Sequence, residues 1–160
     1  IRDRGYATGG FSISVTDYWF NGGPGYFHYG SHNTNHTFEA QIGYDFGPLA
    51  LNWYTNFAGT DGVNNEGDRA YSSYISATVP FTLAGLEWTA EIGATPWATD
   101  FYNYSEDPVC NGSNGFAVCD ISLGAAKEIR ITDSFSVPAF AKVTVNPRTE
   151  GAYFVFGLSF

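Results

Sequence analysis

The sequence predicts an all-β fold, namely a transmembrane, antiparallel, up-and-down β-barrel of about eight strands. Composition is the first reason: 18% of the 160 residues are aromatic, 14% are charged, and there are 19 glycines. Strands favour aromatic and β-branched side chains, and turns favour glycine. The second reason is a period of two in the apolar residues, and the third is a regular alternation of short and long connections. The sequence contains no apolar run of about 18 residues, so it predicts no transmembrane helix.

Eight segments show the alternation expected of a strand with one apolar face. In the last of them, Phe154, Phe156 and Leu158 alternate with Tyr153 and Val155. The eight segments cover residues 11–20, 38–46, 49–58, 71–81, 86–97, 117–131, 135–145 and 151–160. A membrane-spanning strand needs about 9–11 residues, whereas strands of soluble proteins usually have about 5–6, so these lengths favour a membrane-spanning sheet.

Residues 1–10 precede the first predicted strand, so the predicted barrel domain covers residues 11–160. Two interpretations of residues 1–10 stay open. They form a periplasmic tail, or they are the stump of further N-terminal strands, which would raise the strand number above eight.

The connections predict how the barrel is oriented. Residues 47–48, 82–85 and 132–134 are short turns, residues 21–37, 59–70 and 98–116 are long and polar, and residues 146–150 are intermediate. Antiparallel strands place alternate connections at opposite ends, so one end carries the short turns and the other the long loops. Outer-membrane barrels have short periplasmic turns and longer extracellular loops. We therefore expect a bacterial outer-membrane location, with extracellular long loops and, for an even strand number, two periplasmic termini.

The polar face of each strand is expected to line the lumen, because lipid requires a closed sheet with an apolar exterior. An eight-stranded barrel is filled by its own side chains. Buried charges need partners, so an ion-pair and hydrogen-bond network is expected. Its predicted members are Glu39, Glu87, Glu91, Asp120, Glu128, Arg130 and Lys142. A soluble eight-stranded barrel with the opposite faces inward is the alternative, and the long strands weigh against it.

The C-terminal segment YFVFGLSF, residues 153–160, resembles the sorting signal of outer-membrane proteins. Its apolar residues at every second position are Phe154, Phe156, Leu158 and the terminal Phe160. This resemblance implies insertion by the barrel-assembly machinery, in contact with outer-membrane lipid and lipopolysaccharide.

Longer stretches extend the resemblance over nearly the whole chain from Gly10. DYWF at residues 17–20, SHNTNHTFEAQIGY at residues 31–44, and KEIRITDSFSVPAF from residue 127 are similar to uncharacterised outer-membrane proteins of Bacteroides and other Bacteroidota. The resemblance implies a fold and a location, and it implies no chemistry. Members of that group are longer at the N-terminus, which leaves the strand number open.

Two cysteines, Cys110 and Cys119, lie close together in one Gly- and Asn-rich segment. Such a pair predicts a local disulfide and an oxidising compartment, such as the periplasm or the cell surface. Metal binding by two isolated cysteines is the less favoured alternative.

The three histidines, His28, His32 and His36, are spaced four residues apart in a single loop. Imidazoles bind transition metals, so these residues form a candidate metal site. Ordinary loop histidines are the favoured interpretation, and catalysis involving Ser31 and His32 at the outer rim is a third. The oxygen-rich loop at residues 60–69 does not match the spacing of an EF-hand, so a solvated loop is favoured there.

The formal charge of −9 argues against nucleic acid as a partner. No cofactor motif is found. The expected function is therefore non-enzymatic: envelope support, display of loops, or a narrow porin-like passage, with a subunit role in a larger outer-membrane complex as part of the same expectation. The alternative is an enzyme that acts on lipid A or phospholipid at the outer rim.

Overall fold

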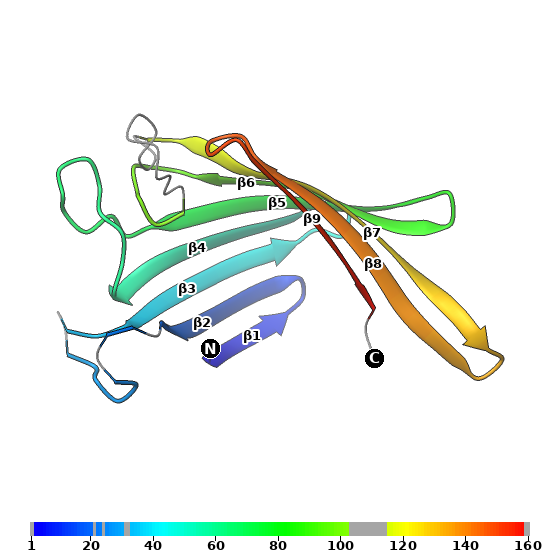
Figure 1. The fold of residues 1–160 in the computed structure, drawn as a ribbon, viewed down its shortest axis with the longest axis horizontal. Helices are drawn as coiled ribbons and strands as arrows, with labels where there is room; N and C mark the ends of the chain where they lie inside the picture. Colours follow the sequence, from blue (N-terminus) through cyan, green and yellow to red (C-terminus); the bar gives the residue numbers. More distant parts are fainter. Residues whose placement is uncertain (1, 21, 24, 31–32, 103–114, 159–160) are drawn as a thin grey trace.

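The computed structural model describes residues 2–20, 22–23, 25–30, 33–102 and 115–158. These residues form a single antiparallel sheet in which each strand pairs with the next along the chain (Figure 1). The nine strands are β1 (Arg2–Thr8), β2 (Phe11–Trp19), β3 (His36–Asp45), β4 (Ala50–Gly59), β5 (Ser73–Leu83), β6 (Leu86–Thr95), β7 (Ala117–Thr132), β8 (Phe135–Asn146) and β9 (Gly151–Leu158). The predicted all-β, antiparallel, up-and-down order is confirmed, and each of the eight predicted segments overlaps one strand, with bounds that differ by up to two residues.

The additional strand is β1, which occupies the segment before the first predicted strand. It pairs with β2 along its whole length, from Arg2 opposite Asp17 to Thr8 opposite Phe11. Gly9 and Gly10 join the two strands with φ angles of 56° and 84°, which only glycine adopts readily and which a two-residue hairpin turn requires. Residues 2–8 therefore form a strand of the sheet and are not a free tail.

The ninth strand corrects the predicted position of the N-terminus. An even strand number would place both termini at the short-turn end, whereas β1 begins at the opposite end from that at which β9 finishes (Figure 1). The error arose because the segment RDRGYAT lacks the alternation of apolar residues that identifies the other strands. Its strand character comes from pairing with β2.

The sheet is open, so the prediction of a closed barrel is not met in this structure. β1 contacts only β2, β9 contacts only β8, and the two edge strands do not contact each other. β1 and β9 run in the same direction in this meander, so a direct pairing of these two strands would be parallel in an otherwise antiparallel sheet.

The two faces of the sheet differ sharply in polarity and in burial. On the outer face, defined by Ile13, Ile42, Leu51, Ile92 and Leu123, the apolar side chains are exposed, and Ile42 is 54% exposed. On the inner face many polar side chains nearer the long-loop end are buried, and Glu39 and Gln41 are each only 9% exposed. Among the described residues the buried apolar ones are only Ala70, Ala94, Cys119 and Val137. The described chain therefore has a polar interior and an apolar exterior.

Hydrogen bonds between side chains organise this inner face. The Gln41 amide nitrogen donates to Ser12 Oγ and to Asn52 Oδ1, each at 3.0 Å. Gly43 lies between these partners in the sheet, and any side chain there would collide with all three. A glycine at this position therefore lets one amide bridge three neighbouring strands.

The predicted asymmetry of the connections is confirmed. The long connections β2–β3, β4–β5 and β6–β7 lie at one end of the sheet, here called the long-loop end, and the tight turns lie at the other, the short-turn end (Figure 1). The described residues include no helix long and apolar enough to cross a membrane.

Candidate functional site at the long-loop end

Two long connections join each other above the inner face at the long-loop end. The Val63 amide donates to Asp100 Oδ1 at 2.7 Å, and the Asp100 amide donates back to the Val63 carbonyl at 3.3 Å. Nearby, the hydroxyls of Ser72 and Thr99 lie 2.6 Å apart, and both residues are almost fully buried. These contacts turn residues 60–72 and 96–102 into one unit that covers this end of the inner face.

Glu39 is the inner-face residue to which this unit is hydrogen-bonded. Its carboxylate accepts a hydrogen bond from the Tyr18 hydroxyl of β2 at 3.2 Å and another from the Tyr102 hydroxyl at 3.0 Å. The Tyr102 ring lies 5.8 Å from the ring of Tyr74 on β5. Burial, and next the negative charge of Glu39, raise the pKa of Tyr102 well above that of an ordinary phenol. Tyr102 therefore stays neutral and remains a donor.

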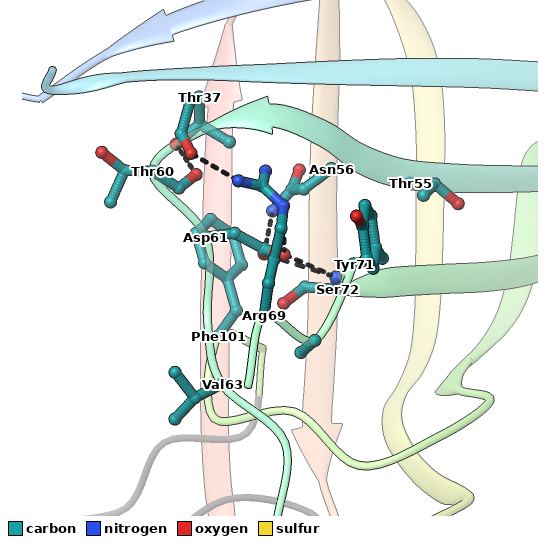
Figure 2. A network of polar contacts seen from close by, with 12 residues as sticks. Thr37, Thr55, Asn56, Thr60, Asp61, Val63, Arg69, Tyr71, Ser72 and Phe101 are labelled. Carbon is teal, nitrogen blue, oxygen red and sulfur yellow. Dashed lines mark hydrogen bonds and ion pairs between the residues drawn. The ribbon is translucent and has the colours of Figure 1, made fainter. Parts of the chain in front are cut away.

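Asp61 anchors the β4–β5 connection in a second cluster (Figure 2). Its side chain is 2% exposed and accepts hydrogen bonds from the Ser72 amide at 3.1 Å and from Asn56 Nδ2 at 3.2 Å. Arg69 Nε lies 3.7 Å from Asp61 Oδ2, which is an ion pair and is longer than a hydrogen bond. Arg69 also donates to the Gly59 carbonyl at 2.8 Å and lies over the ring of Tyr71.

The Asp61 carboxylate thus receives several donors from its own loop and strands. Because both of its oxygens are engaged by these groups, it works as a clamp that fixes the connection to β4 and β5. Arg69 retains two buried nitrogens, Nε and Nη2, without a hydrogen-bond acceptor among the described residues.

The seven predicted lumen residues do not gather at one place. Besides Glu39, Glu91 accepts from Thr78 Oγ1 at 3.3 Å, and Asp120 accepts from Ser122 Oγ at 2.6 Å. Lys142 is half-buried on the inner face opposite Gly124. The remaining three are exposed nearer the short-turn end, namely Glu87, Glu128 and Arg130.

The expected ion-pair network among these seven residues is absent from the described part of the chain. Arg130 pairs instead with Asp133 in its own turn at 2.6 Å. The register places all seven residues on the inner face of the open sheet, at different heights along it. Uncharged donors, mostly tyrosine and threonine, meet the inner-face carboxylates.

The histidines occupy unequal positions. His28 is exposed and His32 lies outside the described residues. His36 is fully buried: its Nδ1 lies 2.7 Å from Asp17 Oδ1, and its Nε2 lies 2.6 Å from the Tyr26 carbonyl oxygen. No group of three His, Cys, Asp or Glu side chains in the described ranges is arranged to hold a metal ion. With both ring nitrogens engaged, His36 is in position neither to ligate a metal nor to act as a general base.

Cys119 is a free cysteine, so the predicted disulfide is not formed. Its buried thiol lies 3.8 Å from the Gly93 carbonyl oxygen, to which it donates a weak hydrogen bond. Its predicted partner, Cys110, lies outside the described residues, as does Phe160 of the predicted assembly signal. The other three residues of that signal, Phe154, Phe156 and Leu158, lie on one face of β9 and are 65%, 78% and 54% exposed.

Sequence reasoning missed most of the residues that organise this site. Tyr18 carried a usable signal, because it shares the polar face of its strand with Thr16. Arg69 and Tyr102 carried none, since loop residues have no period that predicts where they fold back. Asp61 belongs to the oxygen-rich loop noted in the sequence, but its contacts with Asn56 and Ser72 were not predicted.

A comparison of the chain with protein-family models finds no match. The comparisons with curated proteins and with solved structures also find none. The functional argument therefore depends on the geometry described above.

Proposed function

We propose that this chain forms the wall of a bacterial outer-membrane β-barrel with a structural and loop-displaying role. One observation carries the proposal, namely a sheet whose apolar face is exposed and whose polar face is largely buried towards the long-loop end. Each of Ile42, Leu51, Trp53, Ile92 and Leu123 is 43–54% exposed on the same face. Soluble monomers rarely expose contiguous apolar patches above a few hundred Å². Lipid removes this cost, because it covers apolar side chains without requiring a second sheet.

Aromatic side chains at the ends of the strands support the same proposal. Phe11, Tyr44 and Phe46 lie at the short-turn end of the outer face, and Phe38 and Phe57 lie together near the long-loop end, with ring centroids 6.4 Å apart. Tryptophan and tyrosine are enriched where a membrane meets water. Two aromatic zones on the outer face are what a membrane-spanning sheet would need, with the long loops on the extracellular side.

The covered inner face supports loop display over free passage of solutes. Tyr18, Glu39 and Tyr102 join β2, β3 and the β6–β7 connection across the interior at the long-loop end. The Asp61 clamp holds a second connection beside them. A lumen crossed by hydrogen-bonded side chains would conduct poorly, so any porin-like passage would be narrow. Assembly of this chain into a larger outer-membrane complex is compatible with this role.

Closure of the barrel is part of the proposal. Unpaired strand edges are costly in lipid, so β1 and β9 would have to be paired. β1 also carries Arg4 on the outer face beside Val15, and a cation facing lipid at mid-depth costs about 2–4 kcal/mol. The outer side of β1 is therefore expected to be covered by protein. Cysteine pairs placed across β1 and β9 distinguish the routes: an intramolecular cross-link reports direct parallel closure, and an intermolecular one reports a second copy.

The alternative of an enzyme at the outer rim would use Ser31 and His32, which lie outside the described residues. Insertion by the barrel-assembly machinery would use the alternating apolar residues of β9.

The proposal is tested by extracting the full chain in detergent and refolding it into lipid vesicles. We expect β-type circular dichroism and migration on gels that changes with heating. A monomer that remains dispersed in aqueous buffer without detergent would refute the membrane assignment.

A further inference from the structure

The β2–β3 connection contains a short segment, residues 25–30, that folds onto the outer face of the sheet. Tyr29 stacks on the His36 ring with 4.3 Å between centroids, and Tyr26 packs edge-on against Trp19 at 5.9 Å. His36 and Trp19 oppose each other on β3 and β2 and lie on the same face as Ile42 and Ile13. This segment, the aromatic flap, therefore lies outside the sheet, unlike the two connections that cover the inner face.

A buried polar pair holds the aromatic flap in place. The His36 side chain has no exposed surface, and the Asp17 side chain is 16% exposed. His36 Nε2 lies 2.6 Å from the Tyr26 carbonyl oxygen, and Nδ1 lies 2.7 Å from Asp17 Oδ1. Both nitrogens of the buried ring are therefore hydrogen-bonded, which a polar group on an otherwise apolar face requires.

Further hydrogen bonds connect the flap to the start of β3. The Thr34 hydroxyl donates to the His28 carbonyl at 2.7 Å, and the His36 amide donates to the same hydroxyl at 3.1 Å. The titratable groups of the described chain that face the His36 ring are Asp17 from β2 and Tyr26 and Tyr29 from the flap. The flap is therefore tied to both strands that it connects.

The flap presents aromatic surface outward. Phe27 is 86% exposed and Tyr29 is 52% exposed. The flap sequence GYFHYG contains no Asp, Glu, Lys or Arg. Tyr29 lies 6.4 Å from Phe38, and Phe38 lies 6.4 Å from Phe57, so the aromatic surface continues from the flap onto the wall of the sheet.

We infer that the aromatic flap is an interfacial anchor that inserts Phe27 and Tyr29 into the headgroup region of the surrounding lipid at the long-loop end. Continuity with the outer apolar face favours lipid as the occupant, since a partner protein would have to displace lipid from Phe38 and Phe57 as well. An uncharged aromatic segment suits the boundary between headgroups and acyl chains. The inference rests on the proposed membrane insertion.

The test places one fluorophore at a time on the full chain, refolded in phosphatidylcholine vesicles that contain nitroxide-labelled lipids. Cys110→Ala and Cys119→Ala provide a background without native thiols, and the probes are attached at Phe27→Cys, Ile42→Cys and Glu66→Cys. Ile42 is in the middle of the outer face, and Glu66 is exposed in the β4–β5 connection.

A shallow nitroxide is expected to quench the Phe27 probe more strongly than a deep one does. The Ile42 probe is expected to show the reverse order, and the Glu66 probe is expected to respond only to aqueous iodide. If Phe27 behaves like Glu66 while Ile42 is quenched by lipid, the flap contacts water or protein, so the inference fails and the membrane proposal stands. If no lipid nitroxide quenches Ile42, both fail.

A double variant tests whether the Asp17–His36 pair holds the aromatic flap in place. Asp17→Leu with His36→Leu removes both members of the buried pair together and so leaves no unpaired charge. We expect the Phe27 probe to lose its quenching by the shallow nitroxide and to become accessible to iodide, whereas the Ile42 probe keeps its profile. Unchanged quenching at Phe27 would show that the pair does not hold the flap.

Discussion

Tyr102 donates a hydrogen bond of 3.0 Å to Glu39 across 63 residues of sequence. Tyr102 belongs to the β6–β7 connection, and Glu39 belongs to β3, three strands away in the sheet. This bond draws a long connection back onto the inner face of the sheet at the long-loop end.

Tyr102→Phe removes this hydroxyl and keeps the ring beside Tyr74. A hydrogen bond to a charged group contributes about 1.5–3 kcal/mol, so the free energy of unfolding should fall by about that amount. Urea titration in detergent micelles measures the change. Tyr153→Phe is the matched control, because Tyr153 is 60% exposed and its variant should unfold like the native chain. Equal stabilities of the two variants would contradict a role for the bond.

Alkaline pH should weaken the same contact. The pKa of Tyr102 is raised by burial and by Glu39, so the folded protein holds a proton that an unfolded phenol loses near pH 10. The stabilisation is therefore complete below about pH 10 and declines as pH rises above it. Unfolding measured between pH 8 and pH 11 should show a smaller alkaline loss in Tyr102→Phe than in the native chain. If the unfolding free energies of the two proteins fall equally with rising pH, the titration of Tyr102 does not contribute to the alkaline loss.

A charge on the outer face should impair insertion. Ile42→Arg places a cation in the middle of this face, at an expected cost of about 2–4 kcal/mol. The fraction that folds into vesicles, measured by its altered gel migration before heating, should drop sharply. Glu66→Arg is the control, because the exposed loop residue undergoes a larger change of charge at no such cost. Full insertion of Ile42→Arg would place this face in water or against protein.

Loss of the Asp61 charge should loosen the β4–β5 connection. Asp61→Asn weakens the acceptor for the Ser72 amide and leaves Arg69, which is 31% exposed, without its counterion. We expect a loss of about 1–3 kcal/mol in unfolding free energy and earlier proteolytic cleavage within residues 60–72. Asp68→Asn removes the same charge from the exposed turn of that connection and should be nearly neutral. Indistinguishable proteolysis of the two variants would argue against the clamp.

The occupied interior should limit conduction. In planar bilayers the native chain should give no discrete steps above leak, because in the proposed barrel the cluster of Tyr18, Glu39 and Tyr102 would obstruct the interior. Truncation of both tyrosines, Tyr18→Ala with Tyr102→Ala, should raise the conductance if the variant still shows altered gel migration before heating. Steady, large conductance steps from the native chain would contradict the loop-display proposal and favour a pore function.

The alternation of side chains was sufficient to predict eight of the nine strands and the face on which each residue lies. Successive residues of a strand point to opposite sides, so Ile42 and Gln41 reveal their environments by position alone. The lengths of the connections likewise predicted which loops share an end, because antiparallel strands reverse direction at each one.

Only the tertiary structure decided the rest, since it depends on contacts between residues with no shared period. β1 exists because β2 offers it a pairing edge, and with nine strands the sheet ends on two edges that run in the same direction. Tyr102 reaches Glu39, and His36 reaches Asp17 beneath the aromatic flap, because two connections fold back onto opposite faces of the sheet. Sequence alone thus determined the two faces of the wall, and the fold of the loops decided which part of each face is covered.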